Sequence, residues 1–386
     1  MANMTMYQNG AIHAADGVIR DGWLLVEEGR IAEYGPGAPP SAHCQRAEPV
    51  DLAGARLVPG LIDLHAHGAL GCDTMDADPK ALRTMARFYA QHGVTAFLAA
   101  TMSAPAPAIH DALDAVQATM EAGTGGAALL GAHVEGPYLD AARRGAQDAR
   151  WVRSASIDEY PALFDTGVVR LLTLAPELPG GHDLIRYARQ RGAVVSIGHT
   201  RADYDAMRAA VELGASQVTH LFNGMEPLHH REPGAVGAAL TLEGLTCELI
   251  ADGIHLHPAV LKLAYRCKGP DGVVLVTDAM AGTGMPDGDY ALGGAHVTVQ
   301  GGVARDADGA LAGSTLTLER AVANMMQATG EPLERMLPLA SRVPACCLGL
   351  AAKGDIARGR DADLAVLDET GLVRLTMVQG EIVYRS

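Results

Sequence analysis

The chain has 386 residues, of which 48% are hydrophobic and only 4% aromatic, and it contains 45 glycines. This composition excludes a disordered or fibrous protein and is typical of an α/β protein with a large core. The formal net charge of −15, with lysines and arginines scattered singly or in pairs, argues against a nucleic-acid partner, which would need a basic patch.

Both ends of the chain have the character of short β-strands. Residues 1–57 alternate apolar and polar positions between glycines, as around Glu28-Gly29, where a tight hairpin fits. Residues 357–386 repeat this pattern in the segments 363–367 and 378–383. We therefore predict that residues 1–57 and 357–386 together form one small β domain, a β-sandwich, in which residues 35–49 are a loop.

Between the two ends, continuous apolar runs alternate with segments of helical period. This alternation predicts βα units, a parallel sheet and, over residues 58–356, a (β/α)8 TIM-like barrel. Helices are expected at 78–92, 201–213 and 314–328, the last with Ser314 as its cap. Residues 290–310 interrupt the pattern as a hairpin-like insert. The eight apolar runs are residues 57–64, 94–100, 127–134, 169–175, 193–198, 217–222, 246–251 and 273–277.

Residues able to bind a metal or move a proton follow most of these runs. Core packing would favour Val, Ile or Leu there, and a single histidine at a strand end is more often a hydrogen-bonded residue than a ligand. In a barrel, however, the carboxyl ends of all strands meet at one face, which holds the active site. The residues in question are His65, His67, Thr101, Glu135, Glu177, His199, His220, His255 and Asp278.

Two metal positions can be assembled from this set. Glu135, His199 and His220 match the ligands of a catalytic divalent metal, with zinc as the first choice and Fe, Mn or Co as alternatives. His65 and His67 are two residues apart on a strand, so their side chains face the same way and make a second metal plausible. Asp278 closes an apolar strand, where it either caps the next loop or exchanges protons with an attacking water and a leaving amine. We predict one or two metals per subunit and favour the proton-exchange role for Asp278.

The sequence shows no sign of secretion or of a membrane span. No run approaches the ~18 uninterrupted apolar residues that a span needs, and the N-terminus has no apolar signal segment. The six cysteines contain no CxxC pair, which favours reduced thiols. We expect a cytoplasmic protein without a membrane partner, and no glycine pattern indicates a nucleotide cofactor.

The segments around these positions resemble a known family. From VPGLIDLHAHG at residues 58–68 to its end, the chain resembles the N-acetylglucosamine-6-phosphate deacetylases of the amidohydrolase superfamily, and its terminal strands match the small β domain of such enzymes. No single motif is decisive, but their order and spacing are specific. The other motifs are HVEGPY at 133–138, GHT at 198–200, THLFNGM at 219–225, REPG at 231–234, ADGIH at 251–255, VTDA at 276–279 and LAGS at 311–314.

The resemblance implies hydrolysis of the N-acetyl group of N-acetyl-D-glucosamine 6-phosphate to D-glucosamine 6-phosphate and acetate, a step of amino-sugar catabolism. It assigns metal binding to Glu135, His199 and His220, and acid/base catalysis to Asp278. Some relatives lack the HxH pair and use one metal. Because this chain keeps the pair, we expect that the first metal position can be filled and that Glu135 bridges the two metals.

The resemblance also implies how the sugar phosphate is held. Family members are homodimers in which an arginine reaches into the neighbouring site, and Arg231 is that residue here. Its planar guanidinium can pair with two phosphate oxygens, whereas the alternative is a surface salt bridge with Glu232 or a neighbouring residue. The other expected substrate contacts are His255, Asn223 and Gly224.

One position departs from some relatives. They carry a histidine in the loop after EGP that helps to polarise the amide carbonyl, and this chain has Gln147 there. A glutamine amide donates a hydrogen bond but no proton or full charge, so a metal must carry more of the oxyanion stabilisation. We still expect Gln147 to contact the substrate.

Other functions stay open. A deacetylase for the galactosamine epimer, or for another N-acyl substrate, would use the same residues. Cyclic amidases of the superfamily carry a carboxylated lysine at the fourth strand, whereas that strand ends here at Ala175-Pro176-Glu177, which argues against them. A non-catalytic barrel scaffold is less favoured, because no expected ligand is missing. The sequence fixes neither the metal nor the sugar epimer.

Overall fold

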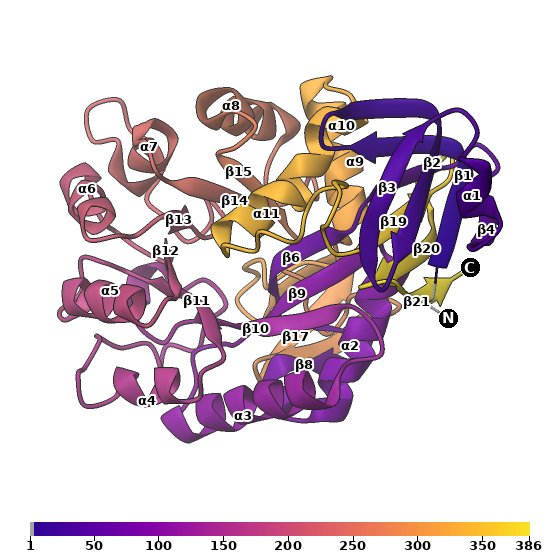
Figure 1. Ribbon diagram of the computed structural model, residues 1–386. Coiled ribbons are helices and arrows are strands. Elements are labelled where there is room, and N and C mark those ends of the chain that lie inside the picture. Colours follow the sequence, from indigo (N-terminus) through magenta and orange to yellow (C-terminus); the bar gives the residue numbers. More distant parts are fainter. Residues whose placement is uncertain (1–3) are drawn as a thin grey trace.

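The computed structural model describes residues 4–386 and contains two large sheets (Figure 1). One is an eight-stranded sheet in a barrel arrangement, and the other is an eight-stranded mixed sheet built from both ends of the chain. The prediction of a (β/α)8 barrel with a small β domain from the two termini is confirmed. The domain boundaries at residues 57 and 357 stay a prediction.

The strands of the barrel are all parallel and neighbour one another in chain order. The first and last strands meet where the backbone N–H of Asp278 donates to the carbonyl of His65 at 2.8 Å. The Thr277 hydroxyl also donates to Asp63 at 2.6 Å, and burial raises the pKa of Asp63 to about 6. The strands are β6 (Leu61–Ala66), β9 (Val94–Ala100), β10 (Ala128–Glu135), β11 (Val169–Leu174), β12 (Val194–Ile197), β13 (Gln217–Val218), β14 (Thr246–Ile250) and β15 (Val273–Val276).

Two of the eight predicted runs differ by more than one residue at an end from the strands that form. The first run divides at Gly60 into β5 (Arg56–Pro59) of the terminal sheet and β6 of the barrel. A side chain at residue 60 would meet Thr95, whose Cγ2 would lie 2.2 Å from its Cβ, so the crossing requires glycine. The sixth run is a strand only over Gln217–Val218, because the chain then turns with positive φ at His220 and Phe222.

Helices follow most of the barrel strands. The predicted helices at 78–92 and 201–213 form with the side chains of Asp78 and Asp203 as N-caps. The third begins only at Leu318, and Ser314 is not its cap, because its hydroxyl donates to the Thr277 carbonyl at 2.6 Å. The α-helices are α1 (Ser41–Cys44), α2 (Pro79–Gln91), α3 (Ala106–Ala122), α4 (Tyr160–Asp165), α5 (Gly181–Gln190), α6 (Tyr204–Glu212), α7 (Gly234–Thr241), α8 (Pro258–Lys268), α9 (Leu318–Thr329), α10 (Leu333–Met336) and α11 (Arg342–Cys347).

The terminal sheet lies at one side of the barrel, where both chain ends are found (Figure 1). Its strand order is β21-β20-β19-β5-β1-β2-β3, and β4 pairs with β1. A separate cluster of buried apolar side chains, including Tyr7, Leu57 and Leu375, packs against it. Its other strands are β1 (Met4–Ala14), β2 (Gly17–Glu27), β3 (Arg30–Pro36), β4 (Glu48–Asp51), β19 (Leu364–Leu367), β20 (Val373–Val378) and β21 (Glu381–Arg385).

The insert after the eighth barrel strand forms an antiparallel sheet of its own. It consists of β16 (Gly288–Leu292), β17 (Ala295–Gln300) and β18 (Val303–Asp306), and its apolar face packs on Met102 and Met280. The insert thus lies close to the carboxyl ends of the barrel strands. A smaller hairpin, β7 (Gly68–Ala69) with β8 (Cys72–Asp73), follows the first strand. Within residues 4–386, no helix is both long and apolar enough to cross a membrane.

Candidate metal centre and active site

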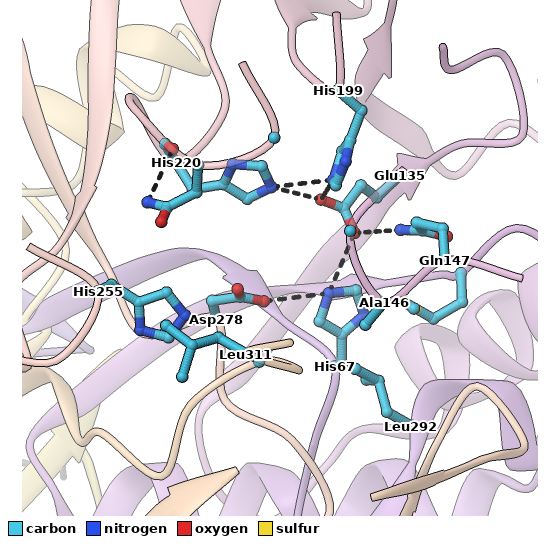
Figure 2. Close-up of a pocket in the computed structure, with 15 residues that line it drawn as sticks. His67, Glu135, Ala146, Gln147, His199, His220, His255, Asp278, Leu292 and Leu311 are labelled. Carbon is cyan, nitrogen blue, oxygen red and sulfur yellow. Dashed lines mark hydrogen bonds and ion pairs between the residues drawn. The ribbon is translucent and has the colours of Figure 1, made fainter. Parts of the chain in front are cut away.

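A cavity of about 240 Å³ opens at the carboxyl ends of the barrel strands. Figure 2 shows its charged side chains directed toward one another from different strands. Arg231 is not among the residues that line it. The predicted site residues that do line it are His67, Glu135, Gln147, His199, His220, Asn223, Gly224, His255 and Asp278.

Glu135, His199 and His220 form a first group, which we call the Glu135 cluster. Oε1 of Glu135 lies 3.2 Å from Nε2 of His199 and 3.0 Å from Nε2 of His220. The two Nε2 atoms are 3.1 Å apart. Nδ1 of His199 lies 2.8 Å from the carbonyl oxygen of Arg143, so this nitrogen carries the hydrogen and Nε2 presents its lone pair to the cluster.

His65, His67 and Asp278 form a second group, the His-pair cluster. Nε2 of His65 and Nε2 of His67 are 3.1 Å apart, and Oδ1 of Asp278 lies 3.3 Å from the latter. Nδ1 of His67 faces the carbonyl oxygen of Ala100 at 3.2 Å, which again leaves Nε2 for the cluster. Both His residues are buried at the end of β6, as the spacing of two residues predicts.

The donor sets of both clusters fit a divalent metal. Imidazole nitrogens that face each other at 3.1 Å repel unless a proton or a cation lies between them. Ligands held at about 2.0 Å by a tetrahedral zinc ion lie about 3.3 Å apart, close to the spacing in each cluster. The ligand atoms of each group lie within 4.8 Å of one another. The chemistry of both groups therefore suits a metal, as the sequence predicts.

Glu135 stands between the two clusters. Its Oε1 faces the His199 and His220 nitrogens, whereas its Oε2 lies 3.3 Å from Nε2 of His67. Burial works to raise the pKa of the Glu135 carboxyl, but the neighbouring imidazoles, above all that of His65, hold it well below its usual range. The carboxylate thus has an oxygen toward each position, and its bridging of two metals stays a prediction.

Burial and neighbouring charges shift the pKa values of His67 and Asp278 in opposite directions. Burial works to lower the pKa of His67, but the carboxylates of Asp278 and Glu135 raise it to about 9. Burial likewise works to raise the pKa of Asp278, and the imidazoles of His65 and His67 bring it to about 2. Without a metal, protons on the histidines balance the two carboxylates, so a cation that binds here displaces protons.

Three further residues line the cavity: His255, Asn223 and Gly224. Nδ1 of His255 pairs with Oδ2 of Asp252 at 2.7 Å, which leaves its Nε2 for a ligand. The amide of Asn223 donates to the carbonyl oxygen of His220 at 3.2 Å and so braces the turn after β13. Gly224 has φ of 63°, and a Cβ there would lie 2.8 Å from Nδ1 of His199, so only glycine lets this turn pass the ligand.

Comparisons with known proteins place the chain in a family. A model of the amidohydrolase family matches residues 56–383, which include both clusters and His255. The chain belongs to the amidohydrolase family. The matched span also includes the strand-end segments in which the sequence analysis placed the metal ligands.

Several relatives of this amidohydrolase are similar over almost their whole length. The chain is 42% identical to the N-acetylglucosamine-6-phosphate deacetylase of Vibrio furnissii, covering 88% of this chain and 86% of that protein. It is 39% identical to the N-acetylgalactosamine-6-phosphate deacetylase of Escherichia coli O157:H7, covering 95% and 96%. A solved structure of a mutant N-acetyl-D-glucosamine-6-phosphate deacetylase from Mycobacterium smegmatis in complex with N-acetyl-D-glucosamine-6-phosphate superimposes with a TM-score of 0.93, at 34% identity and 99% coverage of both chains.

The side-chain amide of Gln147 forms hydrogen bonds through both its nitrogen and its oxygen. Its Nε2 donates to Oε2 of Glu135 at 2.7 Å, and its Oε1 accepts from the backbone N–H of Ser103 at 2.7 Å. Only 2% of the residue is exposed. The contact that this conformation shows is therefore with a metal-cluster carboxylate, and the expected contact with the substrate stays a prediction.

Arg231 lies outside the cavity of its own chain. It is exposed in the segment between β13 and α7, and its guanidinium contacts Nε2 of His230 at 2.8 Å. Among the described residues its guanidinium contacts His230 and forms no ion pair with Glu232 or another acidic residue, which argues against the alternative role as a surface salt bridge. Its predicted role in a neighbouring subunit stays a prediction.

Strand-end position alone misjudges two residues. Glu177 follows β11, but it accepts from the hydroxyl of Thr200 at 2.5 Å and from the N–H of Arg201 at 2.7 Å, so it braces a loop. Conversely, Glu248 lies in the middle of β14, fully buried, and contacts Nδ1 of His65 at 3.1 Å. Glu248 is absent from the strand-end positions, although a carboxyl group inside the apolar run TCELI at 246–250 is a signal that the sequence offers.

Proposed function

We propose that this chain hydrolyses the N-acetyl group of N-acetyl-D-glucosamine 6-phosphate, giving D-glucosamine 6-phosphate and acetate in amino-sugar catabolism. The observation that carries the proposal is the convergence of the Glu135 cluster, Asp278 and His255 on one cavity. A metal site beside a buried acid/base suits amide hydrolysis, and His255 gives the same cavity a polar group for the rest of a substrate. The N-acetylglucosamine-6-phosphate deacetylases at up to 42% identity support this choice.

A divalent cation, with zinc as the first choice and Fe, Mn or Co as alternatives, would be held by the Glu135 cluster and, where two bind, also by the His-pair cluster. When bound, it supplies the Lewis acidity that activates water and polarises the acetyl carbonyl. Glu135 holds its orientation through the hydrogen bond from Gln147 at 2.7 Å. The backbone carbonyl oxygen of Arg143 accepts from Nδ1 of His199 and so fixes the tautomer in which Nε2 is free to bind a metal.

Asp278 then moves the proton. In the metal-free site burial works to raise its pKa, but the positive charges of His65 and His67 bring it to about 2, and a cation bound in place of their protons would likewise keep the carboxylate ionised at the start of the cycle. It accepts a proton from the attacking water as the new C–O bond forms, and it delivers this proton to the amide nitrogen as the C–N bond breaks. The carboxyl returns to its ionised state when the amine leaves.

The sugar phosphate is proposed to occupy the side of the cavity that His255 faces. Nε2 of His255 is available because its Nδ1 is engaged with Asp252, and Asn223 and Gly224 offer an amide and a backbone group nearby. A phosphorylated sugar is charged and does not cross a membrane unaided, so the proposal includes a cytoplasmic location. Measured turnover of three substrates tests it.

The expected order of kcat/KM is N-acetylglucosamine 6-phosphate first, then its galactosamine epimer, then unphosphorylated N-acetylglucosamine. The galacto epimer is the second candidate, because a relative that shares 39% identity is named for it. A higher kcat/KM for the epimer would show that N-acetylgalactosamine 6-phosphate is the preferred substrate, while the proposed deacetylation would stand. Equal values with and without phosphate would refute the phosphate contact, and no turnover of any of the three by metal-loaded protein would refute the function.

We also propose a homodimer in which Arg231 enters the partner's site. The support is the exposed position of this guanidinium, outside its own cavity, and its suitability for phosphate. Mixing Arg231→Ala with Asp278→Asn tests it, since a mixed dimer has one site with both intact groups. Recovery to about a quarter of wild-type turnover is expected, because half of randomly reassembled dimers are mixed. No recovery would refute the contribution of Arg231 to the neighbouring site.

A further inference from the structure

Glu248 is a carboxyl group that the proposed reaction does not use, although it contacts both metal clusters. It lies within β14 between Cys247 and Leu249, and its exposed fraction is 0%. The interior of a protein penalises an unpaired carboxyl group, so its hydrogen-bond partners indicate its purpose.

Both carboxyl oxygens of Glu248 accept hydrogen bonds. Oε1 accepts from the amide nitrogen of Gln217 on β13 at 2.6 Å. Oε2 lies 3.1 Å from Nδ1 of His65 and accepts from the backbone N–H of His220 at 3.2 Å. Since the groups from Gln217 and His220 can only donate, the carboxyl group acts as the acceptor, and His65 donates from Nδ1. One oxygen atom therefore contacts one residue of each cluster.

We propose that Glu248 is a positioning residue that orients His65 and the His220 turn together and thereby sets the metal affinity of the site, above all in the His-pair cluster. With Nδ1 directed to Glu248, Nε2 of His65 faces Nε2 of His67 at 3.1 Å and Oδ1 of Asp278 at 3.6 Å. A carboxyl partner on the far nitrogen fixes the tautomer and raises the basicity of a ligating imidazole. The inference rests on the metal site of the proposed function and is independent of the sugar.

Glu248 supports His220 in a second way. His220 has φ of 30°, a conformation that residues other than glycine seldom adopt. Its N–H bonds the Glu248 side chain, and the next N–H, that of Leu221, bonds the Glu248 carbonyl at 2.9 Å. The side chain and the main chain of one residue thus hold the turn that presents a ligand of the Glu135 cluster.

The alternative is that Glu248 has a purely structural role, and the experiment must distinguish this role from control of metal affinity. A layer of buried polar side chains continues beside Glu248 across the barrel interior, and a residue that only completed this layer would affect stability without affecting metal binding. The edge of His133 packs on His65, with ring centroids 4.4 Å apart. The layer is a chain of hydrogen bonds at 2.6–2.7 Å through His133, Thr173, Thr219 and Ser196.

The test is metal binding to purified wild type, Glu248→Gln and Glu319→Gln, measured by elemental analysis and by competition with a chromophoric chelator. Glu319→Gln is the matched control, because Glu319 also pairs with Nδ1 of a histidine, His92 at 2.8 Å, but outside the cavity. Glutamine keeps the size of the side chain and an acceptor oxygen, so Glu248→Gln chiefly removes the carboxyl charge. The affinity for the second equivalent of Zn²⁺ is expected to fall about 10- to 100-fold in Glu248→Gln and to stay unchanged in Glu319→Gln.

Wild-type affinity for both equivalents in Glu248→Gln would overturn the proposal, as would a wild-type protein that binds only one. If Glu248→Gln does not fold, Gln217→Met decides, because it removes the donor that holds Oε1 and is expected to weaken the same equivalent to a smaller extent. Unchanged metal binding in Gln217→Met would then refute the proposal. Failure of the sugar assays leaves these measurements intact, so the two proposals fail separately.

Discussion

The two metal clusters offer similar ligands from different kinds of backbone. In the Glu135 cluster the histidines follow β12 and β13 at turns, with φ of 49° at His199 and 30° at His220. In the His-pair cluster the histidines lie at the end of β6, and Asp278 comes from just after β15, across the seam where the barrel closes. The histidines of the first cluster depend on local turns, whereas the second cluster joins two strand-end histidines to Asp278, itself at a positive φ of 51°, across the closure of the barrel. Glu135, with an oxygen toward each, links them.

The largest expected effect separates proton transfer by Asp278, a member of the His-pair cluster, from metal binding in the Glu135 cluster. Asp278→Asn should lower kcat by about 10²- to 10⁴-fold, because the positioned acid/base is lost, while the Glu135 cluster still binds its metal. Steady-state kinetics and elemental analysis on the same preparation check this. Asp73→Asn is the control, since Asp73 is buried but bonds the N–H groups of Met75 and Gly293 rather than the site. Near-normal turnover of Asp278→Asn would remove the acid/base assignment.

A pair of ligand substitutions compares the clusters directly. His199→Ala should remove the metal of the Glu135 cluster and nearly all turnover. His67→Ala should cost one equivalent of metal but leave the Glu135 cluster filled and part of the turnover intact. Metal content and kcat of both variants are the measurements. Equal losses in the two variants would show that the clusters bind metal only as a unit.

A smaller effect is expected beside the clusters, at His255. His255→Asn should raise KM for the phosphorylated sugar about 10- to 100-fold with little change in kcat, because a hydrogen bond to a charged group contributes equally to substrate and transition-state binding. The separation of kcat from KM is the readout. A fall in kcat with unchanged KM would place His255 in the chemistry instead.

The smallest expected effect is on stability and depends on pH. The pKa of His67 is raised to about 9 in the metal-free fold, so its proton stabilises that fold fully below the unfolded value near 6.5. This contribution is lost as the pH rises through about 9. Chelated protein should therefore show a Tm that falls between pH 6.5 and 9.5 more than that of metal-loaded protein. Parallel Tm curves for the two forms would contradict the exchange of protons for metal.

Much of this arrangement could be predicted from the sequence because a barrel brings the carboxyl ends of all its strands together at one face. Apolar runs located the strands, and the polar residue after each run located the site. Asp278 and both histidine pairs were found in this way. The ends of the runs were harder to predict, since the chain leaves β13 after only Gln217–Val218 and turns at His220, which depends on partners elsewhere in the fold.

The features of the site that could not be predicted depend on hydrogen bonds between residues far apart in the sequence. Glu135 ends β10 and Glu177 follows β11, but only the structure shows that Thr200 and Arg201 engage Glu177. Glu248 was hidden by its position inside a strand, where polar residues are normally ignored. Gln147 was noticed as an exception, but its contact with Glu135 required the loop after β10 to fold back over the cluster.

Leu292 forms part of the cavity wall but belongs to a different sheet from the barrel strands that present the metal ligands. It lines the cavity from β16, whose sheet shares no strand with the barrel, and it lies beside His67 in Figure 2. A replacement there changes the width of the cavity without moving a strand that carries His67, Glu135 or Asp278. Selection, in nature or in the laboratory, can therefore retune which acyl group or sugar is admitted while the hydrolytic machinery stays constant.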